Sequence, residues 1–361
     1  MENIYVTKSF LPPIEEYQKY TQTIWESGIL TNNGPLVEEL ESKLRSFIHN
    51  DYISYVGNGT IAIQLAIKAL GLSGSIITTP FSYCATTTSI LWENLQPIFV
   101  DINGEDLNIN ANLIEAAIKP DTTAILATHV YGNPCDVEKI EQIAKKHKLK
   151  VIYDAAHAFG VTYKGKSLLN YGDMSTCSFH STKVFHTIEG GSVVCHSEEM
   201  HKLIRLYRSF GHIKDDYFTI GINGKSSEFH AAMGLVNLPY LPSIIKGREK
   251  IVRQYDAVLN FEKLRKPTEI AQDTVPNFAY YPIILPSIDI TNRVIDALNA
   301  QQIFPRRYFY PSLNTLPYLV NPEKCPVSEK IASCVLSLPL YLELSEDIVS
   351  KIVEIINHEL K

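Results

Sequence analysis

The chain has 361 residues, of which 45% are hydrophobic and 20% are charged, and its formal net charge at pH 7 is −6. These values are typical of a globular protein with enough chain for one large and one smaller domain. The acidic balance argues against nucleic acid as a partner, and apolar runs too short to span a bilayer argue against a membrane protein. The six cysteines lack Cys-x-x-Cys spacing and are expected to be reduced, so we expect a cytoplasmic location.

Residues 1–35 contain turn signals such as Pro12-Pro13 and Asn32-Asn-Gly-Pro35 but little hydrophobic periodicity. Such an arm is either a loose tail or an ordered segment that lies over an active site. Apolar residues at helical spacing then predict a helix over residues 36–48.

A glycine-bearing turn follows the first predicted strand, which covers residues 52–56. In this turn Gly59 and Thr60 directly precede a helix predicted over residues 61–70. Free amide groups and the helix dipole attract anions to such an N-terminus. Many α/β proteins contain similar turns, so this turn by itself indicates a phosphate site only weakly.

Two aromatic residues, Phe81 and Tyr83, lie between a second predicted strand at residues 75–79 and a helix that runs to residue 92. An aromatic ring at the end of a strand can stack on a planar cofactor. Both rings can equally be core residues, which is the more usual role.

Strand and helix signals then alternate as far as residue 196, with helices predicted at residues 111–117 and 137–147. This alternation predicts an α/β fold whose seven-stranded sheet is mostly parallel and covered on both faces. Ligands of such sheets gather at the carboxyl ends of the strands. The five further strands are expected at residues 97–100, 124–130, 151–154, 176–180 and 192–196.

The most informative residues are Asp154, which ends a predicted strand, and Lys183, which lies on a polar turn just after another. A lysine amine can bind pyridoxal 5'-phosphate covalently, and a carboxylate can keep the pyridine nitrogen of that cofactor protonated. A surface lysine and a helix-capping aspartate are the alternative interpretation. His180 and His186 flank the lysine, but the spacing of their neighbours does not suit a closed zinc site, so no metal is expected.

A long helix predicted over residues 228–259, with breaks at Pro239 and Pro242, leads out of the large domain. We expect that domain to cover residues 1–250, including the N-terminal arm, and a small C-terminal α+β domain to cover residues 251–361. The small domain contains Arg306-Arg-Tyr-Phe-Tyr310. Paired guanidinium groups beside aromatic rings suit a diphosphate or nucleotide, although a basic strand edge has the same composition.

Stretches along the whole chain resemble the nucleotide-sugar aminotransferases of the DegT/DnrJ/EryC1/StrS family, and among them most of all the viosamine-forming dTDP-4-keto-6-deoxyglucose 4-aminotransferases. The resemblance implies the aspartate-aminotransferase (type I) fold and pyridoxal phosphate as the cofactor. Besides the residues around Asp154 and Lys183, it rests on Val6-Thr-Lys-Ser-Phe-Leu-Pro-Pro13, Leu30-Thr-Asn-Asn-Gly-Pro35, His129-Val-Tyr-Gly-Asn-Pro-Cys-Asp136, Gly221-Ile-Asn-Gly-Lys225 and Arg306-Arg-Tyr-Phe-Tyr-Pro311.

The resemblance assigns roles to individual residues. It favours Tyr83 over Phe81 as the ring that stacks on the cofactor, and it places His157 at the phenolic oxygen of the cofactor. Asn223 is implied to reach the phosphate of a neighbouring subunit, with Lys225 where many members have arginine. The implied cofactor-binding residues are Gly59, Thr60, Tyr83, Asp154, His157, Ser178, Lys183 and Asn223, and the implied substrate-binding residues are Arg306, Arg307, Tyr308 and Tyr310.

The resemblance also implies a reaction. L-Glutamate would donate its amino group, leaving 2-oxoglutarate, and dTDP-4-keto-6-deoxy-D-glucose would receive it, for surface polysaccharide (O-antigen) synthesis by a homodimer with shared active sites. Amination at C-3, a UDP-linked substrate and a catalytically silent regulatory protein are the alternatives. Some members of the family have histidine at the position of the lysine, and these remove a hydroxyl group instead of transferring an amino group. Because this chain has Lys183 there, transamination is the expected outcome.

Overall fold

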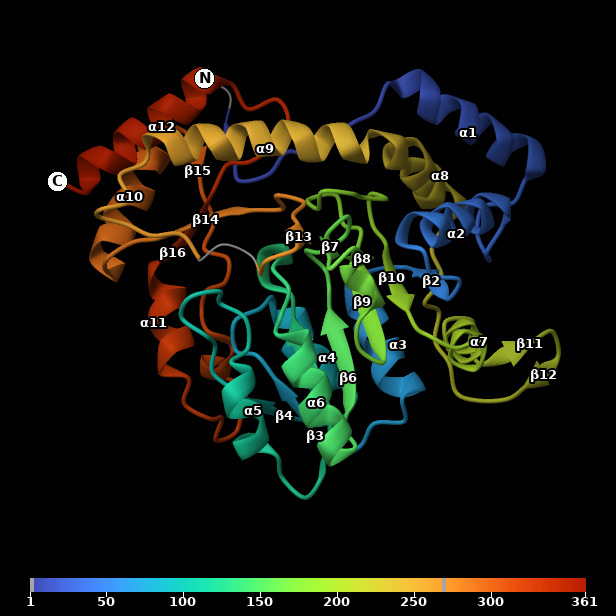
Figure 1. Cartoon of the computed structure of the whole chain (residues 1–361). Coiled ribbons are helices and arrows are strands. Elements are labelled where there is room, and N and C mark those ends of the chain that lie inside the picture. The colour runs from blue at the N-terminus through green and yellow to red at the C-terminus, as the bar shows by residue number, and fades with distance from the viewer. Residues whose placement is uncertain (1–2, 268–270) are drawn as a thin grey trace.

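The computed structural model describes residues 3–267 and 271–361, which are arranged around a sheet of seven strands (Figure 1). The strand order is β2-β10-β9-β6-β5-β3-β4, and β10 alone among these seven runs in the direction opposite to the other six. All seven strands match the sequence prediction, which confirms the mostly parallel sheet. Their bounds are β2 Ile53–Val56, β3 Ser75–Thr78, β4 Gln96–Phe99, β5 Thr122–Thr128, β6 Lys150–Asp154, β9 Met174–Ser178 and β10 Gly191–Val194.

Helices cover both faces of this sheet, so its central strands are apolar on both sides. In β5, Ile125 and Ala127 belong to one apolar core, whereas Ala124 and Leu126 belong to the other. The first core also contains residues of α1 (Ile14–Ser27), α2 (Pro35–Ile48), α5 (Ala111–Ala117), α6 (Val137–His147) and α8 (Glu228–Asn237). The second contains residues of α3 (Gly59–Ala69), α4 (Cys84–Trp92) and α7 (Glu198–Tyr207).

The break predicted at Pro239 is present, because α8 ends at Asn237 and α9 (Leu241–Val258) begins after a 3-10 turn, Leu238–Tyr240. The break predicted at Pro242 is wrong, because Pro242 lies in the first turn of α9, where a proline costs the helix no hydrogen bond. In Figure 1, α9 runs across the top of the molecule toward the C-terminal helices. A separate apolar core forms there, around the antiparallel strands β14 (Tyr281–Ile284) and β16 (Val335–Leu338). The helices of this region are α10 (Ile288–Ala300), α11 (Pro326–Cys334) and α12 (Glu346–Glu359).

From residue 3 on, the N-terminal arm is ordered and touches both parts of the molecule. Its first strand, β1 (Ile4–Tyr5), pairs in parallel with β15 (Ile303–Phe304) of the C-terminal region. The Ser9 hydroxyl then donates a 2.8 Å hydrogen bond to the carbonyl of Ser181, two residues before Lys183. The arm therefore packs against the lysine turn, while the division into domains at residue 250 stays a prediction.

In the described ranges, no helix combines the length and the apolar character that a bilayer crossing needs. The hairpin of β11 (His212–Ile213) and β12 (Asp216–Tyr217) projects from the right edge of the molecule in Figure 1. The remaining short strands are β7 (Thr162–Tyr163), β8 (Lys166–Ser167) and β13 (Thr274–Val275).

Candidate active site

A cavity of ≈ 470 Å³ lies at the carboxyl ends of the strands β6 and β9, beside the N-terminus of the helix α3. Residues from Gly57 to Phe309 line it, so the fold brings distant sequence motifs together. Nine of the twelve residues predicted for the site line this cavity: Gly59, Thr60, Tyr83, Asp154, His157, Ser178, Lys183, Arg306 and Tyr308.

The N-terminus of α3 forms one side of the cavity. The Asn58 side chain caps the helix by accepting a hydrogen bond of 2.8 Å from the amide of Ile61. The other amides of this first turn belong to Gly59 and Thr60, which lack partners within the helix and line the cavity. A Cβ atom on Gly59 would lie 2.9 Å from the Cβ of Ser178, so only glycine allows this close approach. This side of the cavity therefore offers an anionic group the free amides of Gly59 and Thr60, the helix dipole of α3 and the hydroxyl of Ser178.

Asp154 is 5% exposed at the end of β6. One carboxylate oxygen accepts a 2.7 Å hydrogen bond from the Thr86 hydroxyl, and the other accepts a 3.1 Å hydrogen bond from the amide of Ala156. Burial raises the pKa of Asp154, and these two hydrogen bonds and the charge of Lys183 oppose that increase. A buried carboxylate held on both oxygens is a fixed acceptor for a protonated ring nitrogen.

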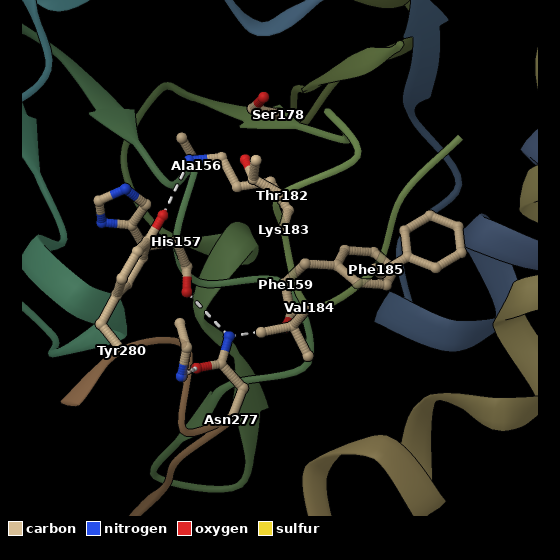
Figure 2. A pocket seen from close by; sticks show the side chains of 11 residues that line it. Ala156, His157, Phe159, Ser178, Thr182, Lys183, Val184, Phe185, Asn277 and Tyr280 are labelled. Atoms are coloured by element: carbon tan, nitrogen blue, oxygen red, sulfur yellow. Dashed lines mark hydrogen bonds between the residues drawn. The ribbon is translucent and has the colours of Figure 1, made fainter. Parts of the chain in front are cut away.

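Lys183 extends from its turn toward Tyr280, as Figure 2 shows, and its Nζ atom lies 3.4 Å from the tyrosine hydroxyl. Burial lowers the pKa of Lys183, but Tyr280 and then Asp154 outweigh burial and leave this pKa above its ordinary value. Lys183 and Asp154, 29 positions apart in the chain, thus line one cavity, and the charge of Lys183 lowers the pKa of Asp154 there, while their roles toward a cofactor stay a prediction.

The His157 ring is held in one orientation and one tautomer. Its Nδ1 atom accepts a 3.2 Å hydrogen bond from the amide of Tyr131, so the proton of the neutral ring is on Nε2. Burial, followed by the charge of Lys183, lowers the pKa of His157 well below its usual value, which keeps the ring neutral. The ring stacks on Phe309, with centroids 5.5 Å apart. His157 can therefore donate a hydrogen bond from Nε2 as a neutral group.

The two aromatic candidates differ clearly. Phe81 is fully buried and packs edge-on against Phe309, with centroids 5.6 Å apart, so it is a core residue. Tyr83 is 60% exposed, precedes α4 and lines the cavity. The position of Tyr83 is thus the one from which a ring can reach a bound ligand.

The two adjacent arginines also differ. Arg306 lines the cavity together with Tyr308, and its guanidinium carbon lies 5.9 Å from the centre of that ring. Arg307 instead bonds to Asn292 and stacks on Tyr310, at 4.8 Å from the ring centre. Neither Arg307 nor Tyr310 is among the residues that line the cavity.

Asn223 is exposed and lies outside the cavity, in a separate hollow of ≈ 300 Å³ that Lys225 also lines. Gly57 lines both hollows and donates a 2.8 Å hydrogen bond to the carbonyl of Gly224. The loop of Asn223 therefore lies beside the turn of α3 without entering its own cavity.

Sequence reasoning missed Tyr280 and Phe309, which both line the cavity. Tyr280 lies next to an apolar strand and looks like a core residue, and a polar group 97 positions from Lys183 gives no local signal.

Within residues 3–267 and 271–361, His, Cys, Asp and Glu side chains form no group of three or more that can hold a metal ion.

Comparisons with known proteins point in one direction. Residues 13–357 match the profile of the DegT/DnrJ/EryC1/StrS aminotransferase family. The chain is 45% identical to a dTDP-4-amino-4,6-dideoxy-D-glucose transaminase of Shigella dysenteriae over 98% of both chains, and 38% identical to a protein of that name from Escherichia coli, also over 98% of both. Its structure resembles that of DesI in the presence of its TDP-sugar product, with a TM-score of 0.94 and 27% identity over 100% of this chain and 93% of the other.

Proposed function

The chain belongs to the DegT/DnrJ/EryC1/StrS aminotransferase family, and we propose that it transfers an amino group from L-glutamate to C-4 of dTDP-4-keto-6-deoxy-D-glucose. The product would be dTDP-4-amino-4,6-dideoxy-D-glucose, together with 2-oxoglutarate. The observation that carries this proposal is the 45% identity, over nearly the full length of both chains, to a relative named for that product.

Pyridoxal phosphate is the cofactor, and when bound it supplies an electron sink for the carbon that gains or loses the amino group. The residues present fit it. The first turn of α3 and Ser178 suit its phosphate, because Gly59 has no Cβ atom and so lets Ser178 approach the free amides of that turn closely. Asp154 suits its ring nitrogen, since a buried carboxylate can keep that nitrogen protonated.

Lys183 has two roles in this proposal. Its Nζ atom would hold the cofactor covalently in the resting enzyme, and as a free amine it would take up and return a proton at the reacting carbon. The Tyr280 hydroxyl keeps the free amine directed into the cavity. His157, whose Nδ1 atom accepts from the amide of Tyr131, would donate from Nε2 to the phenolic oxygen of the cofactor.

The nucleotide sugar is proposed to lie beside Arg306 and Tyr308, the two members of the Arg306–Tyr310 stretch that line the cavity. A guanidinium group pairs well with phosphoryl oxygens, and a tyrosine ring can pack on a sugar or base. Arg307 and Tyr310 pack on each other away from the cavity, so we assign them a supporting role.

We propose a homodimer whose active sites each use Asn223 of the other subunit. Asn223 lies outside the cavity of its own chain, and the neighbouring hairpin exposes large apolar side chains that a second copy would cover. Among them Tyr217 is 77% exposed and Ile220 is 84% exposed.

The cytoplasmic location also stays a proposal, supported by six cysteines that are all unpaired.

The experiment that tests this function compares substrates directly. The holoenzyme is incubated with isotope-labelled L-glutamate and either the dTDP- or the UDP-linked 4-keto-6-deoxy sugar, and the label in the sugar is followed by mass spectrometry. Label in the dTDP-sugar supports the proposal, whereas preference for the UDP-sugar supports that alternative carrier. If neither sugar gains label in an enzyme that exchanges label between glutamate and 2-oxoglutarate, the assigned acceptor is wrong.

A further inference from the structure

A chain of three buried hydroxyl groups ends on the carboxylate of Asp154. Thr128 at the end of β5 bonds to Ser82 at 3.0 Å, Ser82 bonds to Thr86 of α4 at 2.7 Å, and Thr86 bonds to Asp154 at 2.7 Å. The four side chains are between 0% and 5% exposed. Two segments of the chain, residues 82–86 and the end of β5, therefore meet at the carboxylate of Asp154.

The direction of these hydrogen bonds follows from the number of protons. An ionised carboxylate only accepts, so Thr86 must donate its single hydroxyl proton to Asp154. The bond between Ser82 and Thr86 is then donated by Ser82, whose own oxygen accepts from Thr128. All three O–H dipoles point toward the carboxylate. Hydrogen bonds aligned in this way polarise one another and favour the negative charge at their end.

We propose that Ser82, Thr86 and Thr128 form a hydroxyl relay that holds Asp154 ionised and oriented toward the ring nitrogen of the cofactor. The inference rests on the proposed role of Asp154 and adds three positioning residues to it. Burial alone favours the neutral carboxyl, which cannot stabilise a protonated ring nitrogen. The relay opposes that tendency without placing a further charged group beside the cofactor.

The neighbouring residue Thr87 provides a matched control. Thr86 and Thr87 are adjacent in α4 and are both 0% exposed. The Thr87 hydroxyl has no hydrogen-bond partner among the described residues, whereas the Thr86 hydroxyl donates to Asp154. Thr86→Val and Thr87→Val thus remove the same atom at the same depth, but only the first removes a contact with the carboxylate.

The test measures the affinity of the cofactor-free enzyme for pyridoxamine phosphate, which binds without a covalent bond. We expect Thr86→Val to weaken binding about tenfold or more, the effect of losing a hydrogen bond to a charged group. Thr87→Val should bind as the unmodified protein does, and Thr86→Ser should restore affinity because it keeps the hydroxyl. Equal affinities for the two valine variants would overturn the relay.

A double-mutant cycle separates the relay from general damage to the fold. If Thr86 acts through the carboxylate, Thr86→Val should cost little further affinity when Asp154 is already asparagine. An equal loss in both backgrounds would contradict the inference. Should Thr86→Val fail to fold, Ser82→Ala removes the next donor and should weaken binding in the same direction but less, and an unchanged affinity would count against the relay. An Asp154→Asn variant with normal affinity would instead refute the proposed role of Asp154 itself.

Discussion

The Nζ atom of Lys183 lies 3.4 Å from the hydroxyl oxygen of Tyr280, which joins the turn after β9 to the segment just before β14 (Figure 2). Because Tyr280 is the largest of the groups that raise the pKa of Lys183 against burial, we expect Tyr280→Phe to lower that pKa. Only the neutral amine attacks the cofactor aldehyde. Pyridoxal phosphate should therefore attach to the cofactor-free variant faster than to the unmodified protein at low pH, where the lysine of the latter is protonated. The rate of attachment is followed by absorbance.

Tyr281→Phe is the control for this prediction. The Tyr281 hydroxyl bonds to Asp256 at 2.5 Å and not to the lysine, so its removal should leave the pH profile of attachment in place. A Tyr280→Phe profile that coincides with that of the unmodified protein would show that the tyrosine does not control the charge of Lys183.

Lys183 is expected to carry the cofactor. The purified protein should show visible absorbance from the lysine-bound cofactor, and borohydride should fix that bond so that the label maps to the peptide containing Lys183. Lys183→Ala should abolish turnover yet still bind pyridoxamine phosphate, since the phosphate and ring contacts remain. A label on any other lysine would disprove the assignment.

Asp154→Asn should keep the fold and lose at least about 10²-fold in turnover, the scale of a lost preorganised electrostatic contact. The amide cannot hold a positive charge on the ring nitrogen, so the electron sink is weakened. Steady-state kinetics with glutamate, beside a thermal unfolding curve, measures both effects. Near-normal turnover would place the partner of the ring nitrogen elsewhere.

Mixed dimers test whether Asn223 acts across an interface. Lys183→Ala and Asn223→Asp are each expected to be inactive, the second because its carboxylate repels the phosphate. If Asn223 serves the other subunit, one site of each heterodimer contains both lesions and the other site contains none. Subunit exchange should then restore up to about half of the activity per heterodimer. No recovery after proven exchange would mean that Asn223 acts within its own chain.

The sheet and the main site residues were predictable because their signals are local. Apolar runs fixed the seven strands, and Asp154 and Lys183 each follow a strand whose end marks the ligand edge. The choice of Tyr83 over Phe81 came from the family resemblance, and the structure gives it a reason, since Phe81 is buried and Tyr83 lines the cavity.

The remaining features depend on contacts between distant segments. Tyr280 meets Lys183 across 97 positions, and the Thr86 hydroxyl meets Asp154 across 68, while serine and threonine at strand ends and in helices are too common to stand out. The sequence left open which of the adjacent arginines faces the substrate. In the structure Arg306 lines the cavity, whereas Arg307 bonds to Asn292 and packs on Tyr310.

The most direct test of the proposed function is the structure of the product. The holoenzyme is incubated with L-glutamate and dTDP-4-keto-6-deoxy-D-glucose, and the purified sugar nucleotide is examined by NMR. We predict an amino group on C-4 in the gluco configuration and one equivalent of 2-oxoglutarate. An amino group on C-3, or the unchanged 4-keto sugar recovered from enzyme that remains active toward glutamate, would contradict the assignment.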